Sequence, residues 1–197
     1  MVAVPECMHE FLGEESTWQE LSAVFLVAFV ATAAQAVAYG PSSFDVPIWR
    51  YWLGLFLAAD VFAGSVGNLT RGTNDHYASS ARRRWAFIAV HWHLIAIFAC
   101  WHAASGEEFQ ACLLVNVCVL VVASIVNLSP KAGGVQRFVG GVLMVCFMFS
   151  LAVLHPLSQD MMPVTVMFAL KVSYCFAVDH YYGLGCDAEA DYKALGA

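Results

Sequence analysis

The stretch Val164–Val178, VTVMFALKVSYCFAV, decides the fold class because it is long, apolar and interrupted by only one charged side chain, Lys171. It is one of six apolar stretches in a chain of 197 residues. An α-helix needs about 20 mainly apolar residues to cross a bilayer, so six of them would use well over half of the chain. The sequence therefore predicts an all-α, polytopic integral membrane protein, a bundle of six transmembrane helices.

The composition supports this class and argues against others. Hydrophobic residues make up 60% of the chain and charged residues 12%, whereas a soluble domain carries about 25% charged residues. The net charge of −6 argues against nucleic acid as a partner. The cysteines are scattered without a CxxC pair, so they predict neither a disulfide framework nor a zinc site.

We expect a single transmembrane domain over residues 1–197, with no separate soluble domain. A short acidic segment, residues 1–19, precedes the first helix, and its acidic character argues against a cleavable signal peptide. Thr17 and Glu20 have the T-x-x-E spacing of a capping box, which indicates a helix start. A short tail, residues 183–197, follows the last helix. The expected helices are residues 21–39, 48–67, 85–104, 109–128, 138–154 and 163–182.

The distribution of Lys and Arg predicts the orientation in the membrane, since cytoplasmic loops carry an excess of both. Most of the nine basic residues fall on one side of the predicted bundle. They are Arg71, Arg82, Arg83, Arg84, Lys131, Arg137 and Lys193. With an even number of spans, both termini are then expected in the cytoplasm, in a membrane that the sequence does not specify.

Ionisable residues from three predicted helices fall at similar depths. With a rise of about 1.5 Å per residue, they lie roughly 12–21 Å from one boundary of an apolar core about 30 Å thick. These residues are Asp60, His91, His93 and Lys171. Asn116 falls near the same level, and Tyr174 shares the predicted helix face of Lys171. The shared depth predicts one polar site inside the bundle, a relay for protons or solute formed by these six residues.

Asp60 and Lys171 are the expected ion pair of this site, because each alone is a costly buried charge. Gly64 and Gly67 lie on the same helix face as Asp60, which allows a neighbouring helix to approach the carboxylate closely. Two interpretations stay open. The pair either takes up and releases protons during transport, or only fixes the register of the two helices.

The histidines give a second hypothesis. His91 and His93 are two residues apart, so on a continuous helix they point roughly 200° away from each other and form no metal clamp. His91 and His102 share one face of that helix and are candidate ligands for haem. His155 and His180 are weak candidates for the opposite ligands. The sequence favours no cofactor, and haem is the one that it leaves open.

The segment Asn68–Tyr77 is the most polar internal stretch, and we expect a loop there. It leads to Arg82–Arg84. One interpretation is a polar lid that holds an anionic group, and the other is an ordinary basic loop attracted to anionic lipid. Its candidate site residues are Asn68, Arg71, Thr73, Asn74, Asp75 and His76.

The leading functional prediction is a small transporter or channel in which Asp60, Lys171, His91 and His93 form a protonatable site. The alternatives are a redox protein that holds haem or a metal, and a structural subunit of a larger membrane complex. No catalytic motif is apparent, so an enzyme is not favoured. The expected partners are the lipid bilayer and a proton or small solute, with a homo-oligomer or larger complex left open.

Overall fold

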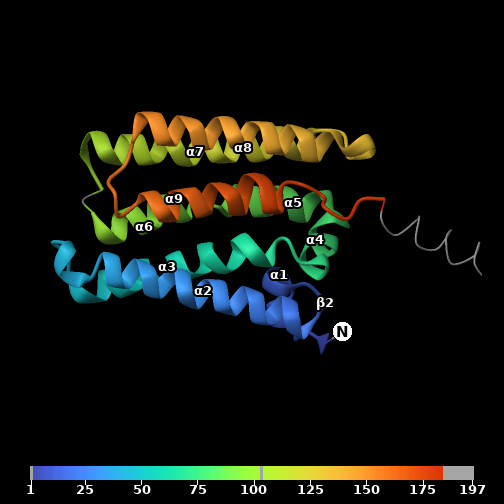
Figure 1. Cartoon of the computed structure of the whole chain (residues 1–197), viewed down its shortest axis with the longest axis horizontal. Helices are drawn as coiled ribbons and strands as arrows, with labels where there is room; N and C mark the ends of the chain where they lie inside the picture. The colour runs from blue at the N-terminus through green and yellow to red at the C-terminus, as the bar shows by residue number, and fades with distance from the viewer. Residues whose placement is uncertain (1, 103, 184–197) are drawn as a thin grey trace, which may run out of the picture.

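In the computed structural model, which describes residues 2–102 and 104–183, the chain is a bundle of helices lying side by side along the long axis of the molecule (Figure 1). Among the described residues, one pair of two-residue strands accompanies the helices; it lies in the N-terminal segment, with Val2 opposite Ser16. The elements in chain order are β1 (Val2–Ala3), η1 (Glu6–Met8), α1 (His9–Leu12), β2 (Glu15–Ser16), α2 (Trp18–Ala38), η2 (Pro41–Ser43), α3 (Ile48–Gly67), α4 (Arg71–Ala78), α5 (Ala81–Val90), α6 (His93–Trp101), α7 (Gly106–Leu128), η3 (Ala132–Gly134), α8 (Val135–Leu154), α9 (Met162–Ala169) and the π-helix η4 (Leu170–Phe176).

Four helical stretches of the described chain are long and apolar enough to cross a membrane. They are Trp18–Ala38, Ala81–Trp101, Gly106–Leu128 and Ala132–Leu154. A fifth candidate consists of α3 and α4 taken together, which are bent by 89° relative to each other. The apolar helix Met162–Phe176 is shorter. The helical class is thus confirmed, with four to five candidate spans where the sequence predicts six.

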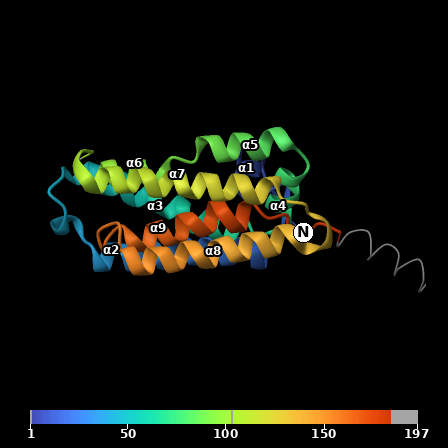
Figure 2. The same ribbon diagram turned by 90° about the horizontal axis from the view of Figure 1, so that it is seen from above.

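The successive helices alternate in direction, so the described chain begins and ends at the same end of the bundle (Figures 1 and 2). We call this the termini end; it also carries α1, α4 and the start of α5. The connections from α2 to α3, from α6 to α7 and from α8 to α9 lie at the opposite end, which we call the loop end. Residues 184–197 of the predicted tail lie outside the described part of the chain.

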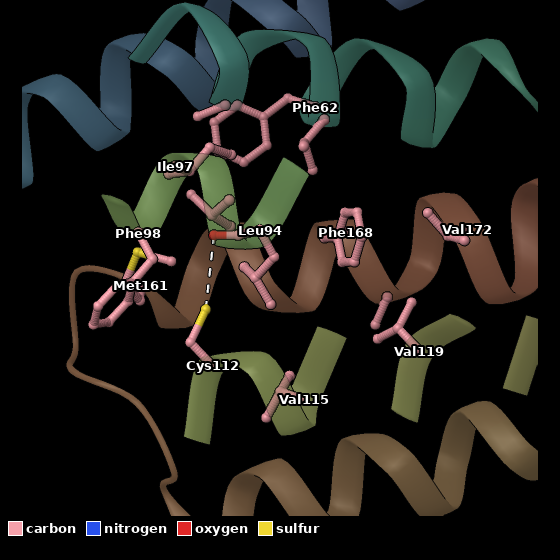
Figure 3. Close-up of a cluster of buried hydrophobic side chains, with 14 of the residues drawn as sticks. Phe62, Leu94, Ile97, Phe98, Cys112, Val115, Val119, Met161, Phe168 and Val172 are labelled. Carbon is pink, nitrogen blue, oxygen red and sulfur yellow. Dashed lines mark hydrogen bonds between the residues drawn. The ribbon is translucent and has the colours of Figure 1, made fainter. Parts of the chain in front are cut away.

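The hydrophobic core lies where α3, α6, α7 and α9 meet (Figure 3). Leu94, Ile97, Val119 and Phe168 are completely buried there, and Cys112 Sγ donates to the Leu94 carbonyl at 3.7 Å. Large apolar side chains also cover the outward faces of α2, α7 and α8 and remain exposed. Apolar surface of this extent is unusual for a soluble monomer and is what contact with lipid requires.

The predicted capping box at the start of α2 is confirmed. Thr17 Oγ1 accepts from the Glu20 backbone N–H at 3.2 Å, and the Glu20 carboxylate accepts from the Thr17 N–H at 2.7 Å. The helix therefore begins at Trp18, earlier than the predicted residue 21, because the capping residue stands directly before the first helical turn.

The predicted third helix, residues 85–104, is broken into α5 and α6. The helical path stops at His91, whose backbone has φ −84° and ψ 71°. Asn116 of α7 donates from Nδ2 to the His91 carbonyl at 3.3 Å, so the carbonyl released at the break is satisfied from a neighbouring helix. Beyond the break α6 packs on α3, whereas the main contacts of α5 are with α4 and α7.

The last helix ends at Phe176, where the sequence predicts a helix to residue 182. Side chains from other elements donate to the carbonyl groups that directly follow its last residue. Arg84 Nη2 donates to the Ala177 carbonyl at 2.5 Å, and Asn74 Nδ2 donates to the Val178 carbonyl at 3.0 Å. These bonds cap the helix, because the last carbonyls of a helix have no partner within it.

Candidate functional site

A cavity of about 650 Å³ lies between α2, α3 and α5 in the half of the bundle near the termini end. It lies where α5, which ends at the break at His91, diverges from α3. Its walls are mainly apolar and include Val24 and Phe25 of α2, Phe56 of α3 and Val90 of α5. The polar side chains that line it are Asp60, Asn68, Arg83, His91, His93 and Lys171.

The expected ion pair is present on the wall of this cavity. Lys171 Nζ lies 2.6 Å from Asp60 Oδ2 and 3.3 Å from the Asp60 carbonyl. The Lys171 side chain is 5% exposed, whereas that of Asp60 is 24% exposed, so the carboxylate is the half of the pair that a ligand in the cavity can reach. A Cβ on Gly64 would lie 2.3 Å from Lys171 Cε, so this glycine makes room for the lysine.

His93 joins the pair as a third member. Its Nε2 lies 3.4 Å from Asp60 Oδ2, and its side chain is 26% exposed. The expectation that His91 and His93 point in opposite directions is wrong, because their ring centroids are 4.9 Å apart. The reason is the break between them, which turns the chain so that both rings lie on the same side.

His91 is more constrained than His93. Its Nδ1 is hydrogen-bonded to the Phe87 carbonyl at 2.5 Å, and its ring stacks on Phe87 with the centroids 3.7 Å apart. Asn116 is completely buried and holds the broken end of α5. In the described structure both residues position the helix break, while His93 contacts the carboxylate.

The structure does not bring Tyr174 to this site. Its ring faces α8, where a Cβ on Gly140 would lie 3.3 Å from Tyr174 Cδ2, and its ring centroid is 5.3 Å from that of His180. Lys171 and Tyr174 both belong to the π-helix η4, whose turns are wider than those of an α-helix. Two residues three apart therefore diverge more than the sequence spacing predicts.

The polar segment after α3 is a helix, α4, where the sequence predicts a loop. Thr73, Asn74 and His76 are buried on its inner face, and this burial explains why the segment is folded. Asn68, just before α4, donates from Nδ2 to the Lys171 carbonyl at 3.3 Å. The segment thus ties α3 and α4 to η4 and does not form an open lid.

The remaining members of that predicted polar site lie elsewhere on α4. Arg71 and Asp75 form an exposed i,i+4 ion pair of 3.4 Å on the outer surface. His76 Nδ1 lies 3.7 Å from Glu14 Oε1 in the N-terminal segment. The six predicted residues therefore do not converge on one ligand site.

Arg84 is a residue that sequence reasoning missed. The run Arg82–Arg84 reads as an exposed basic cluster, but Arg84 is buried, with 4% of its surface exposed. It donates to the Ala177 carbonyl and to Asn127 Oδ1, both at 2.5 Å. The available signal was its spacing, since Arg84 and Ile88 lie at i and i+4 on the inward face of α5.

The candidate haem ligands are not gathered. His102 lies at the loop end, where its Nε2 is 2.7 Å from Asp160 Oδ2; His155 is exposed at the end of α8; and His180 is hydrogen-bonded to the Tyr174 carbonyl. Over residues 2–102 and 104–183, no group of three or more His, Cys, Asp or Glu side chains is arranged to hold a metal ion.

The contact between His102 and Asp160 changes the protonation of both groups. The hydrogen bond to Asp160 raises the pKa of His102 despite its partial burial. Burial, the largest single influence, raises the pKa of the Asp160 carboxyl, but the hydrogen bond and charge of His102, together with hydrogen bonds from Ser158 and the backbone, outweigh it and the pKa is lowered. Both shifts favour the charged pair, which joins α6 to the connection before α9.

Comparison of the chain with protein-family models, curated proteins and solved structures finds no match. The function is therefore argued from the geometry of the site. The feature that stands out is an ion pair, joined to a histidine, on the wall of an apolar cavity in the half of the bundle near the termini end.

Proposed function

We propose that this protein is an integral membrane transporter or channel that moves protons or a small solute, with Asp60, Lys171 and His93 as its protonatable site. One observation carries the proposal: the Asp60 carboxylate of a 2.6 Å ion pair faces a cavity of about 650 Å³ and has His93 beside it. Ionisable groups inside a membrane domain are costly, and those facing a cavity are typical of ion and proton pathways.

The proposed topology has six crossings, with the segment that begins at Met162 as the sixth. The alternating helix directions and the common end of the described termini support it. Arg82–Arg84 and Lys131 lie at the termini end, which is then the cytoplasmic side.

In the proposed cycle, a proton that reaches Asp60 through the cavity neutralises the carboxylate. The Lys171 ammonium then lacks its counter-charge in a poorly solvated position, which favours transfer of its proton to the imidazole of His93. His93 releases that proton, and transfer of the Asp60 proton to Lys171 restores the pair. The π-helix around Lys171 supports such a rearrangement, since π-helical turns are frequent at functional sites.

Proton flux into liposomes tests this proposal. The purified protein is reconstituted with a pH-sensitive dye inside the vesicles, and a pH gradient is applied. We expect Asp60→Asn to abolish the protein-dependent flux, because the amide cannot take up a proton. Asp160→Asn is the matched control at the loop end and retains flux. Unchanged flux in folded Asp60→Asn protein would rule the proposal out.

A further inference from the structure

We infer that the cavity binds a long-chain carboxylate, with the carboxylate on Arg83 at the termini end and the chain between α2 and α5, directed toward His93. The inference rests on the proposed function, because it names the class of solute that the site admits. Three properties of the cavity carry it: its walls, its side opening and its charge.

The walls fit an apolar chain. Most of the lining residues are aliphatic or aromatic, and they include Phe56 of α3 and Val90 of α5. The volume of about 650 Å³ lies in the usual range for ligand sites, about 300–1,000 Å³. A hydrocarbon chain gains free energy from such walls at about 25 cal/mol per Å² removed from water, whereas a polar solute does not.

The cavity also has an edge that faces the surroundings of the bundle. Phe25, Phe56 and Val90 line it and yet remain 58%, 72% and 65% exposed, respectively. Because the exposed side chains at this edge are apolar, the edge opens toward lipid. A molecule dissolved in the bilayer can therefore enter sideways, between α2 and α5, without crossing a polar surface.

The charge of the cavity selects an anion. Its lining contains two cationic side chains, Arg83 and Lys171, against one carboxylate, Asp60. Lys171 is occupied by Asp60, which leaves Arg83 as the uncompensated charge within the lining. Both described hydrogen bonds of the Arg83 side chain come from Nη1, and a guanidinium has five N–H donors in all. It can therefore hold a carboxylate at the position where lipid headgroups lie.

Equilibrium binding of radiolabelled oleate to the full chain in nanodiscs of neutral lipid tests the inference. We expect saturable binding that is at least tenfold weaker for oleyl alcohol, which has the same chain without the charge. Equal affinity for the two molecules would overturn the role of Arg83. Absence of saturable oleate binding would overturn the inference as a whole.

Two pairs of variants locate the site. Ala63→Phe fills the cavity and is expected to reduce oleate affinity at least tenfold, whereas Ala152→Phe on the exposed face of α8 leaves it unchanged. Arg83→Gln is expected to weaken binding, and Arg82→Gln, with the same change of charge outside the lining, is not. Equal effects within either pair would place the lipid elsewhere.

Different experimental outcomes contradict the inference and the proposed function. Asp60→Asn is expected to lose proton flux and keep oleate binding, because the carboxylate of the lipid is held at Arg83. Flux that depends on Asp60 without any oleate binding contradicts the inference alone. Oleate binding that depends on Ala63 and Arg83, with flux independent of Asp60, contradicts the proposed function.

Discussion

Helix α3 is packed along one half and faces a cavity along the other. Toward the loop end, Gly54 admits the Trp101 indole so closely that a Cβ would lie 2.3 Å from Nε1. The indole donates to the Tyr51 carbonyl at 3.2 Å and stacks on Phe44. Toward the termini end, the corresponding space beside Gly64 holds the Lys171 side chain next to the cavity.

The difference between the two halves comes from the partner of α3 and not from α3 itself. In the loop half the partner is α6, which packs on α3 throughout. In the termini half α5, which ends at the break at His91, diverges from α3 and contacts α4 and α7. The break in the neighbouring helix thus separates the packed core from the cavity, and the ion pair lies at the boundary between them.

The largest effect is expected from truncating the centre of the packed half. Trp101→Ala removes a side chain that is 2% exposed and leaves a void, so it should lower the free energy of unfolding by about 3–5 kcal/mol. Phe56→Ala, which removes a 72% exposed ring at the cavity, should cost less than about 1 kcal/mol. Reversible denaturation in mixed detergent micelles measures both. Similar losses would show that the two halves are packed alike.

A loss of about 3 kcal/mol is expected for Lys171→Met, because the partly buried Asp60 carboxylate loses its counter-charge. Adding Asp60→Asn to the same chain should recover most of that stability, since no uncompensated charge then remains. The same denaturation assay reads out the single and double variants. A double variant as unstable as the single one would mean that the pair is not the source of the loss.

Gly54→Ala should destabilise the protein by about 1–3 kcal/mol, because the new Cβ overlaps the Trp101 indole. Gly141→Ala is the matched control in α8, where a Cβ would meet nothing within 4 Å. It should stabilise the helix by about 0.5–1 kcal/mol through its lower backbone entropy. Differential scanning fluorimetry of the two variants compares them, and shifts of the same sign would contradict the close packing at Gly54.

The smallest effect is expected from the His102–Asp160 pair at the loop end. The pKa of His102 is raised, so its contribution to the free energy of unfolding is complete below about pH 6.5. That contribution is lost as the pH rises through the raised pKa. The pKa of Asp160 is lowered, so its contribution to the free energy of unfolding is complete above about pH 4. That contribution is lost as the pH falls through the lowered pKa. Stability from the pair is therefore greatest between those limits.

His102→Gln should remove the alkaline decline and lower Tm by roughly 2–4 °C near pH 6, as a loss of about 1 kcal/mol implies for a chain of this size. His155→Asn, an exposed histidine at φ 41° replaced by a residue that tolerates this conformation, should leave the pH profile unchanged. Melting curves recorded from pH 4 to pH 9 test both. A wild-type profile that stays flat above pH 6.5 would contradict the coupling.

The pairing of Asp60 with Lys171 could be predicted from the sequence, because a lone charge at that depth is costly and each has one natural partner. The capping box at Thr17 could be predicted for a similar reason, since its bonds are local. In both cases the identity of the residues is enough to explain why the interaction forms.

The break at His91 could not be predicted in the same way. No Pro or Gly marks it, and the side chain that satisfies the freed carbonyl, Asn116, lies on another helix. The same holds for Arg84, whose acceptors belong to η4 and α7 and become neighbours only in the folded bundle. The cavity and the position of His93 follow from that break. The sequence therefore predicted which residues form the site, but not how they are arranged around a cavity.

Accessibility of two positions on one helix tests the central claim, that where α3 borders the cavity one of its faces is open and the other packs into the core. The seven native cysteines are replaced, and Ala63→Cys or Ala58→Cys is introduced. Ala63 lines the cavity and Ala58 is completely buried. A small, membrane-permeant maleimide should label Ala63→Cys and leave Ala58→Cys unmodified. Failure to label Ala63→Cys, or equal labelling of both positions, would contradict the account.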